Sequence, residues 1–140
     1  MRLAKADSRL RIEGGRDVEI PTHYEGPDLQ ETADGSGLTV DELVALHSGR
    51  VYRAFFLGFL PGFAYCGVLD RRIVAPRLVR PRERVPAGSV AIADGQTSVY
   101  PFDSPGGWRL IGRTDVSVFD SARETPALIR PGDRVRFVAR

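Results

Sequence analysis

Two runs of β-forming residues flank the pair Asp94-Gly95 in the stretch GSVAIADGQTSVY, residues 88–100. Asp-Gly is a preferred pair at the centre of a two-residue type I′ turn, in which both central residues need a positive φ. The stretch therefore predicts a β-hairpin whose turn lies at Asp94-Gly95. No other local signal in the chain constrains the fold as strongly.

Further β-type runs lie on both sides of this hairpin. They are VEIPTHY (18–24), closed by its proline, VYRAFFLGF (51–59), WRLIGRT (108–114), VSVF (116–119) and PGDRVRFVAR (131–140). In the last run, Val135 and Phe137 point one way and Arg134 and Arg136 the other. Fifteen glycines and ten prolines favour many turns and short strands over long helices. Six or more short strands in one domain favour a closed or nearly closed barrel.

The first of two expected helices lies in GPDLQETADGSG, residues 26–37. Pro27 suits a first helical position, and Asp28 suits the first turn, where a negative charge is favourable. Gly35 and Gly37 are expected to end this helix.

The second expected helix lies in TVDELVALHSG, residues 39–49. Thr39 and Glu42 form the T-x-x-E pattern of a capping box. Apolar residues and His47 recur at helical spacing on one face, and the final glycine is expected to stop the helix. His47 has the chemistry of a general base, but its place on the apolar face favours a packed, hydrogen-bonded side chain.

The length of 140 residues suits one domain. We expect residues 1–17 to form a lead-in or an edge strand and residues 18–140 to form the barrel. The N-terminus has no apolar segment typical of a signal peptide, and the single Cys66 cannot form an intrachain disulfide. Both observations favour the cytoplasm, and no membrane partner is expected.

Several classes of chemistry are excluded by residue type. Lys5 is the sole lysine, so no Walker-type loop and no biotin-carrying or Schiff-base lysine is expected. His23, His47 and Cys66 do not have zinc-ligand spacing, and no G-x-S-x-G motif occurs. We therefore expect no metal site and no self-contained hydrolase, and we assign no catalytic residue.

The stretch APRLVRPRERVPAGS, residues 75–89, is a first candidate site. Its prolines hold the chain extended, and four arginines project from it: Arg77, Arg80, Arg82 and Arg84. Arginine binds carboxylate or phosphate in a bidentate manner. A solvated basic edge that discourages strand pairing is an equally good interpretation. Nucleic acid is not an expected partner, because the net charge is only +2 and no aromatic residues interleave with the arginines.

Two further stretches, LGFLPGFAYCGVL (57–69) and VYPFDSPGGWRLIGRT (99–114), combine glycine and proline with aromatic residues. Glycine permits close approach of a ligand, and aromatic side chains form pocket walls. A barrel corner with Trp108 in the core is the structural alternative. We expect the segments GFLPGFAY, PRLVRPR and SPGGW to converge on one concave site, where Arg77 and Arg82 bind a small-molecule carboxylate. The candidate substrate-binding residues are Phe59, Pro61, Phe63, Tyr65, Arg77, Arg82, Ser89, Gln96, Tyr100, Gly106, Gly107, Trp108 and Arg113.

Five segments, IPTHY…GPDL, GLTVDELVALHS, LGFLPGFAYCGVL, APRLVRPRERVPAGSVAIADGQTSVYP and SPGGWRLIGRT, occur in the same order as in a known family. From about Val18 onward the chain resembles the allophanate hydrolase subunit 1 family, which includes the B subunit of bacterial 5-oxoprolinase and the kinase inhibitor KipI. The resemblance implies a cyclophilin-like β-barrel. It also implies a second subunit of related barrel architecture and a third 5-oxoprolinase component, which together open 5-oxoproline to glutamate in an ATP-dependent reaction. ATP and magnesium would belong to that complex, with no cofactor bound by this chain alone.

Three features depart from the family pattern. The small α/β domain that usually precedes the barrel has no counterpart here, the glycine-rich segment before GPDL is reduced to Glu25, and Asp115 replaces the proline of GRTP. The leading hypothesis is a non-autonomous subunit of an ATP-dependent hydrolase that acts on a small cyclic or ureido amide. The alternatives are a regulatory binding module resembling KipI and a barrel recruited to another small-molecule reaction, such as a cyclisation. Peptidyl-prolyl isomerisation is a weaker idea that rests on fold analogy.

Overall fold

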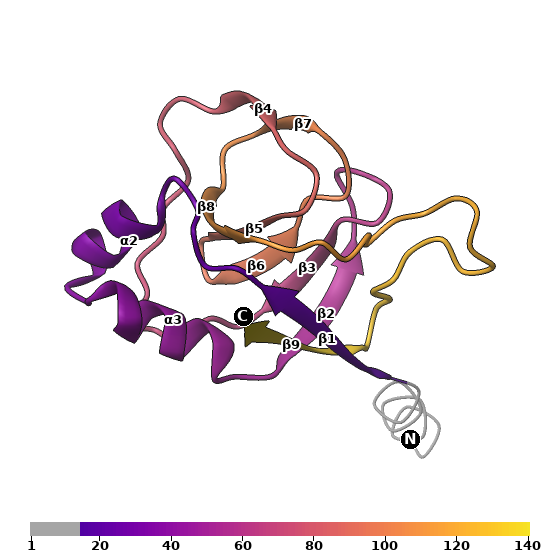
Figure 1. Cartoon of the computed structure of the whole chain (residues 1–140), viewed down its shortest axis with the longest axis horizontal. Coiled ribbons are helices and arrows are strands. Elements are labelled where there is room, and N and C mark those ends of the chain that lie inside the picture. Colours follow the sequence, from indigo (N-terminus) through magenta and orange to yellow (C-terminus); the bar gives the residue numbers. More distant parts are fainter. Residues whose placement is uncertain (1–14) are drawn as a thin grey trace, which may run out of the picture.

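The computed structural model describes residues 15–140, and most of its regular structure is β-strand (Figure 1). Two helices lie together on one side of a strongly curved sheet, and a two-stranded ribbon stands apart from it. The helices are α2 (Leu29–Ser36) and α3 (Val40–Ser48). The strands are β1 (Asp17–Thr22), β2 (Tyr52–Leu57), β3 (Ala64–Gly67), β4 (Arg82–Val85), β5 (Ser89–Ala93), β6 (Gln96–Val99), β7 (Ser104–Gly106), β8 (Arg109–Arg113) and β9 (Arg134–Ala139).

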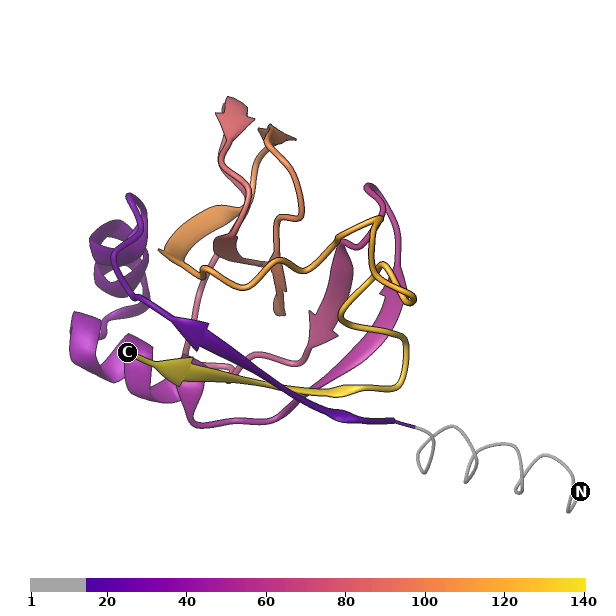
Figure 2. The same ribbon diagram turned by 45° about the vertical axis from the view of Figure 1, so that its right-hand side comes forward.

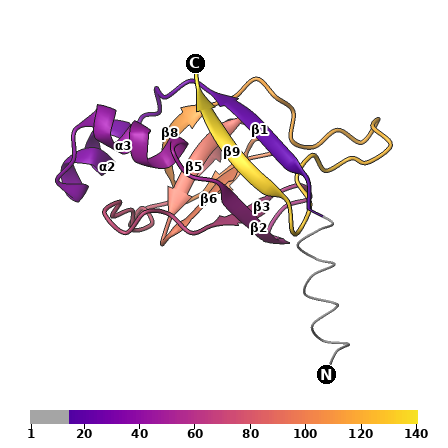
Figure 3. The same ribbon diagram turned by 90° about the horizontal axis from the view of Figure 1, so that it is seen from below.

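Seven strands form one sheet in the order β1-β9-β2-β3-β6-β5-β8. Strands β1 and β9, side by side in Figure 3, are parallel, whereas the other neighbours are antiparallel. A bridge just beyond β1 joins the two edges, because the N–H groups and carbonyls of His23 and Arg113 exchange hydrogen bonds of 2.8 and 2.9 Å. The prediction of a mainly β chain with a nearly closed barrel and two helices near the N-terminus is confirmed.

The predicted hairpin is formed by β5 and β6, with Ala93 opposite Gln96. Asp94 and Gly95 both have positive φ, 49° and 86°, as a type I′ turn requires. Strand β9 also shows the predicted alternation, since Val135 and Phe137 are buried while Arg136 is exposed.

Two details of the strand predictions were wrong. Residues 116–119 form no strand, because their backbone bonds stay within a local excursion and the only β contact is a bridge from Phe119 to Ala127. Strand β1 continues past Pro21, which is tolerated because β1 pairs along its length with β9 alone. A further short strand, β3, lies within the apolar stretch of residues 57–69.

The boundary predicted at residues 17 and 18 is not tested. Residues 1–14 lie outside the described residues, and strand β1 begins at Asp17. The division into a lead-in and a barrel therefore stays a prediction. Within residues 15–140, no helix has the length and apolar character needed to cross a membrane.

Both predicted helices are present. In α3, the Thr39 side chain accepts a hydrogen bond from the Glu42 N–H, and the Glu42 carboxylate accepts one from the Thr39 N–H, which completes the capping box. Gly37 ends α2 with φ 72°, in the left-handed region that glycine adopts without strain. Gly35, which was also expected to end the helix, lies within it.

His47 is fully buried at the end of α3 and belongs to the core, as predicted. Its Nδ1 lies 2.6 Å from the Tyr24 hydroxyl, and its Nε2 lies 3.0 Å from Thr97 Oγ1. Because Thr97 Oγ1 donates its proton to the Ala91 carbonyl, it accepts from Nε2, which makes Nδ1 the acceptor. Burial lowers the pKa of His47 to about 3, so the neutral ring is the form packed in the core.

The core has two parts, which cover the two faces of the sheet. The larger cluster takes alternate residues from all seven sheet strands, including Ile20, Tyr52, Cys66, Ile92 and Phe137, and fills the barrel interior. The smaller cluster lies on the outer face under the ribbon and consists of Phe63, Val85, Ala91, Ala93, Tyr100, Trp108 and Leu110. Strand β5 is buried on both faces for this reason.

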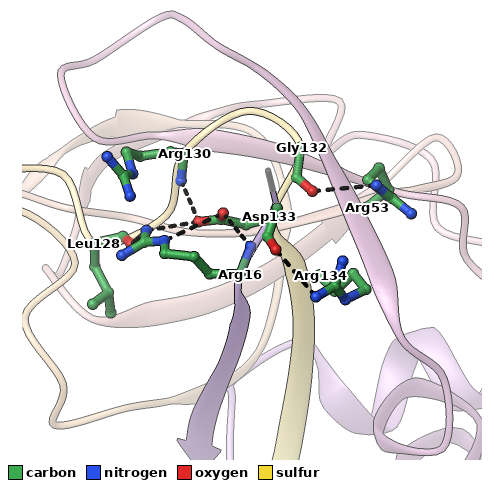
Figure 4. Close-up of polar contacts among 8 residues, drawn as sticks. Arg16, Arg53, Leu128, Arg130, Gly132, Asp133 and Arg134 are labelled. Atoms are coloured by element: carbon green, nitrogen blue, oxygen red, sulfur yellow. Dashed lines mark hydrogen bonds and ion pairs between the residues drawn. The ribbon is translucent and has the colours of Figure 1, made fainter. Parts of the chain in front are cut away.

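A buried carboxylate ties the turn before β9 to the residue that precedes β1 (Figure 4). Asp133 is 1% exposed and accepts hydrogen bonds from the Arg16 backbone and guanidinium and from the Arg130 N–H. The Arg16 guanidinium also donates to the Leu128 carbonyl at 2.7 Å. Burial raises the pKa of Asp133, but these hydrogen bonds outweigh it and hold the pKa below its usual value.

Candidate functional site

The ribbon formed by β4 and β7 stands clear of the barrel at the top of Figure 2. Between this ribbon and the outer face of the sheet lies a cavity of about 270 Å³. It is lined by Phe59, Tyr65, Arg77, Pro81, Tyr100, Pro105, Gly106, Gly107 and Trp108. The structure thus brings the GFLPGFAY, PRLVRPR and SPGGW segments together in one pocket.

The floor of the pocket is a cluster of aromatic rings around Phe63. Its ring meets those of Tyr65, Tyr100 and Trp108 at centroid distances of 5.1, 5.2 and 5.3 Å, all close to edge-to-face. This geometry is favourable for aromatic pairs. Phe63 itself is 1% exposed, so it supports the floor from beneath.

One wall is the turn of residues 58–62, which explains why glycine and proline interrupt the apolar stretch. Hydrogen bonds from the Gly58 N–H to the Phe63 carbonyl and from the Phe63 N–H to the Leu60 carbonyl close this turn. Phe59 has φ 67°, an uncommon conformation for a bulky residue. Its ring is 61% exposed and rests edge-on against Phe63, at the mouth of the pocket.

The opposite wall needs a glycine for a steric reason. A Cβ at Gly106 would collide with the Tyr100 hydroxyl oxygen, whereas a Cβ at Gly107 would meet Pro81 at an ordinary 3.7 Å. The close approach seats the Tyr100 hydroxyl beneath Gly106 of β7. Burial, the largest influence, raises the pKa of Tyr100, so the hydroxyl keeps its proton at neutral pH.

Arg77 supplies the positive charge of the pocket. Its guanidinium carbon lies 5.9 Å from the centroid of the Trp108 ring, and its Nε lies 3.2 Å from Asp94 Oδ2. The side chain is 59% exposed. Because guanidinium has five N–H donors, the bond to Asp94 orients the group and leaves donors to serve a bound anion.

Arg82 was expected to bind a substrate carboxylate, but in the structure it pairs with a carboxylate of this chain. Its Nη1 and Nη2 each lie 2.8 Å from an oxygen of Asp28, which is 5% exposed. Asp28 also accepts a hydrogen bond of 2.7 Å from the Leu110 N–H. Arg84 is likewise paired, with Asp103. Arg82 and Arg84 are therefore both engaged by carboxylates of this chain, and the binding of a substrate carboxylate by Arg82 stays a prediction.

Four other candidate residues lie outside the lining. The Ser89 hydroxyl donates to the Pro86 carbonyl, Arg113 pairs with Glu25 and Asp115 at the barrel seam, Gln96 follows the hairpin turn, and Pro61 is exposed. Two lining residues were missed, Pro81 and Pro105. Both adjoin named residues, and their rigid apolar rings were a signal for pocket walls. The substrate-binding role of the whole set stays a prediction.

Two findings on the described residues concern metal and thiol chemistry. Across residues 15–140, no group of three or more His, Cys, Asp or Glu side chains could hold a metal ion. Cys66 is buried, which raises the pKa of its thiol to about 12 and leaves it protonated at neutral pH. The arrangement can bind a small anion with an apolar body, but it presents no activated cysteine beside the pocket.

The family model for the carboxyltransferase domain, subdomain C and D, matches residues 1–129. The chain is 52% identical over 126 residues to the B subunit of 5-oxoprolinase from Escherichia coli O157:H7, covering 88% of this chain and 58% of that protein. The corresponding figures for the 5-oxoprolinase B subunit of Bacillus subtilis (strain 168) are 47%, 88% and 52%. The chain therefore spans between half and three fifths of the length of these two relatives.

Several solved structures contain a domain with the same fold as this chain. The uncharacterized protein PH0987 from Pyrococcus horikoshii has a TM-score of 0.86 and 48% identity, over 96% of this chain and 63% of that one. TTHA0988 has a TM-score of 0.87 and 50% identity, over 89% of this chain and 26% of that one. Urea amidolyase of K. lactis, at 20% identity and a TM-score of 0.75 over 90% of this chain and 10% of that one, shares the fold. The chain belongs to the family of the carboxyltransferase domain, subdomain C and D, whose model spans residues 1–129.

Proposed function

We propose that this chain is a ligand-binding, non-autonomous part of a cytoplasmic, ATP-dependent amide hydrolase complex of the 5-oxoprolinase type. The observation that carries the proposal is a pocket that places one arginine, oriented by Asp94, beside an aromatic wall. Identities of 47 and 52% to the B subunits of two 5-oxoprolinases support the same assignment.

The proposed ligand is a small cyclic or ureido amide that bears a carboxylate. The free N–H donors of Arg77 would take the carboxylate, because guanidinium and carboxylate form charge-assisted hydrogen bonds. The apolar ring of the ligand would lie against Trp108 and Tyr65, beneath Phe59. A cavity of about 270 Å³ suits a molecule of this size, since it lies near the lower end of the range for small-molecule pockets.

ATP and magnesium would be bound elsewhere in the complex. Phosphoryl transfer needs groups that hold phosphate and metal, and the single lysine of this chain is Lys5. We propose that a second subunit of related barrel architecture and a third component supply these groups. This chain would then bind and orient the amide substrate.

The test is reconstitution. The purified chain is incubated with ATP, magnesium and 5-oxoproline, and glutamate and phosphate are assayed, first alone and then with the second and third components. We expect turnover only when all components are present. Turnover by the chain alone would refute the shared-site proposal. Inactivity with all components present would refute the 5-oxoprolinase assignment.

A further inference from the structure

Phe119 lies outside the pocket lining and contacts a residue next to each of two pocket walls, Gly62 and Phe102. A Cβ built on Gly62 would come within 2.8 Å of the Phe119 Cβ, so the Phe119 side chain rests directly on the backbone of the turn 58–62. On its other side, the Phe119 ring meets the Phe102 ring at a centroid distance of 5.3 Å. Phe119 thereby touches two segments that are 40 residues apart in sequence.

The two residues that Phe119 contacts, Gly62 and Phe102, are each a few residues from a lining residue in the sequence. Gly62 belongs to the hydrogen-bonded turn that carries Phe59, and its φ of 82° requires glycine. Phe102 lies three residues before Pro105, in the segment that leads into β7. A shift of either contact would therefore be passed to a pocket wall over a few residues.

The backbone on either side of Phe119 is anchored to the barrel core. It lies in the excursion between β8 and β9, where it pairs with Ala127 and where the Leu128 N–H donates to the Val118 carbonyl at 2.9 Å. Val118 and Ile129, on either side of this pairing, are each 2% exposed and belong to the barrel core. The excursion thus anchors Phe119 to the barrel independently of the pocket.

We propose that Phe119 is a positioning residue that sets the separation of the two pocket walls and thereby the affinity for the ligand. The identity of the ligand rests on the function proposed above, whereas the effect on the pocket does not. Packed cores transmit small shifts through contacting side chains. Removal of the Phe119 ring lets the Phe59 turn and the segment before β7 relax, and the pocket opens.

Trp108 is the only tryptophan of the chain and lines the pocket, so its fluorescence reports on the site. We expect Phe119→Ala to increase acrylamide quenching of Trp108. It should also weaken 5-oxoproline binding, measured by fluorescence titration, by about twofold to thirtyfold, the range expected of couplings through packed side chains. Phe119→Tyr, which keeps the ring, should behave like the wild type. Phe55→Ala is the matched control, because Phe55 is 48% exposed and packs over Gly67, outside the pocket lining.

A double variant separates positioning from general destabilisation. If Phe119 acts through the turn that carries Phe59, its effect on affinity should be much smaller in a Phe59→Ala background, so the two losses are not additive. A folded Phe119→Ala protein with wild-type quenching would overturn the inference, as would equal quenching changes in Phe55→Ala. If Phe119→Ala does not fold, Phe119→Leu and Phe102→Ala test the two contacts separately by the same criteria. Failure of 5-oxoproline to bind the wild type would refute the proposed ligand, and the quenching comparison would still decide the role of Phe119.

Discussion

Replacement of Arg82 by methionine tests whether its pair with Asp28 is structural. The change removes two hydrogen bonds of 2.8 Å and leaves the Asp28 carboxylate, 5% exposed, with the Leu110 N–H as its remaining partner. Removing one member of a buried ion pair costs about 3–5 kcal/mol. Because the Arg82 side chain is 29% exposed, water reaches one side of the pair, and we expect the lower end, about 3 kcal/mol.

The stability cost of Arg82→Met should depend on pH in a definite direction. Burial raises the pKa of Asp28, but the bonds from Arg82 and Leu110 outweigh it, so the folded pKa lies below the usual value. In the wild type the pair therefore adds stability that is present above the unfolded pKa of about 3.9 and lost as the pH falls through the folded pKa. Without Arg82, burial raises the folded pKa instead, so the cost of Arg82→Met should shrink between pH 7 and pH 4.

The assay is urea unfolding followed by Trp108 fluorescence and circular dichroism at both pH values. The double variant Asp28→Asn/Arg82→Met is the control, because the neutral amide can still accept from Leu110 and should lose only about 1 kcal/mol. A loss below about 1 kcal/mol in Arg82→Met at pH 7, or a loss that is the same at both pH values, would refute the reasoning.

Three further predictions use the fluorescence titration of ligand binding or the urea unfolding assay. Arg77→Met should weaken 5-oxoproline binding about tenfold or more, while folded Arg82→Met binds like the wild type; equal losses in both variants would contradict the assignment of the anion site. Burial lowers the pKa of His47 to about 3, so the unfolded chain binds one more proton than the folded chain below pH 6.5. The free energy of unfolding of the wild type, measured in urea, should therefore fall by up to about 1.4 kcal/mol per pH unit between pH 6.5 and 4.5. The fall should be shallower in His47→Gln, and an unchanged slope would argue against a neutral buried ring. Thr39→Ala should lose about 1 kcal/mol of unfolding free energy through the cap of α3, with Thr39→Ser as the control that keeps it.

The site could be predicted from the sequence only at the level of its segments. Glycine beside proline and aromatic residues marked the stretches that line the pocket, because these residue types have special backbone freedom or large apolar surfaces. The different contacts of Arg77 and Arg82 were not predictable in this way, since both project from the same proline-rich stretch. Asp28, the partner of Arg82, is 54 residues away in sequence and was assigned to a helix start.

The sequence by itself determined the local features, which depend on residues close together along the chain. The Asp94-Gly95 turn, the Thr39–Glu42 capping box and the alternation of β9 depend on backbone preferences and neighbouring side chains, and each was present in the structure. Only the tertiary structure decided which segments meet. Examples are the closure of the barrel between His23 and Arg113, the absence of a strand at residues 116–119, and the contacts of Phe119 with Gly62 and Phe102. These features depend on long-range contacts, whose energies arise only when distant segments are packed together.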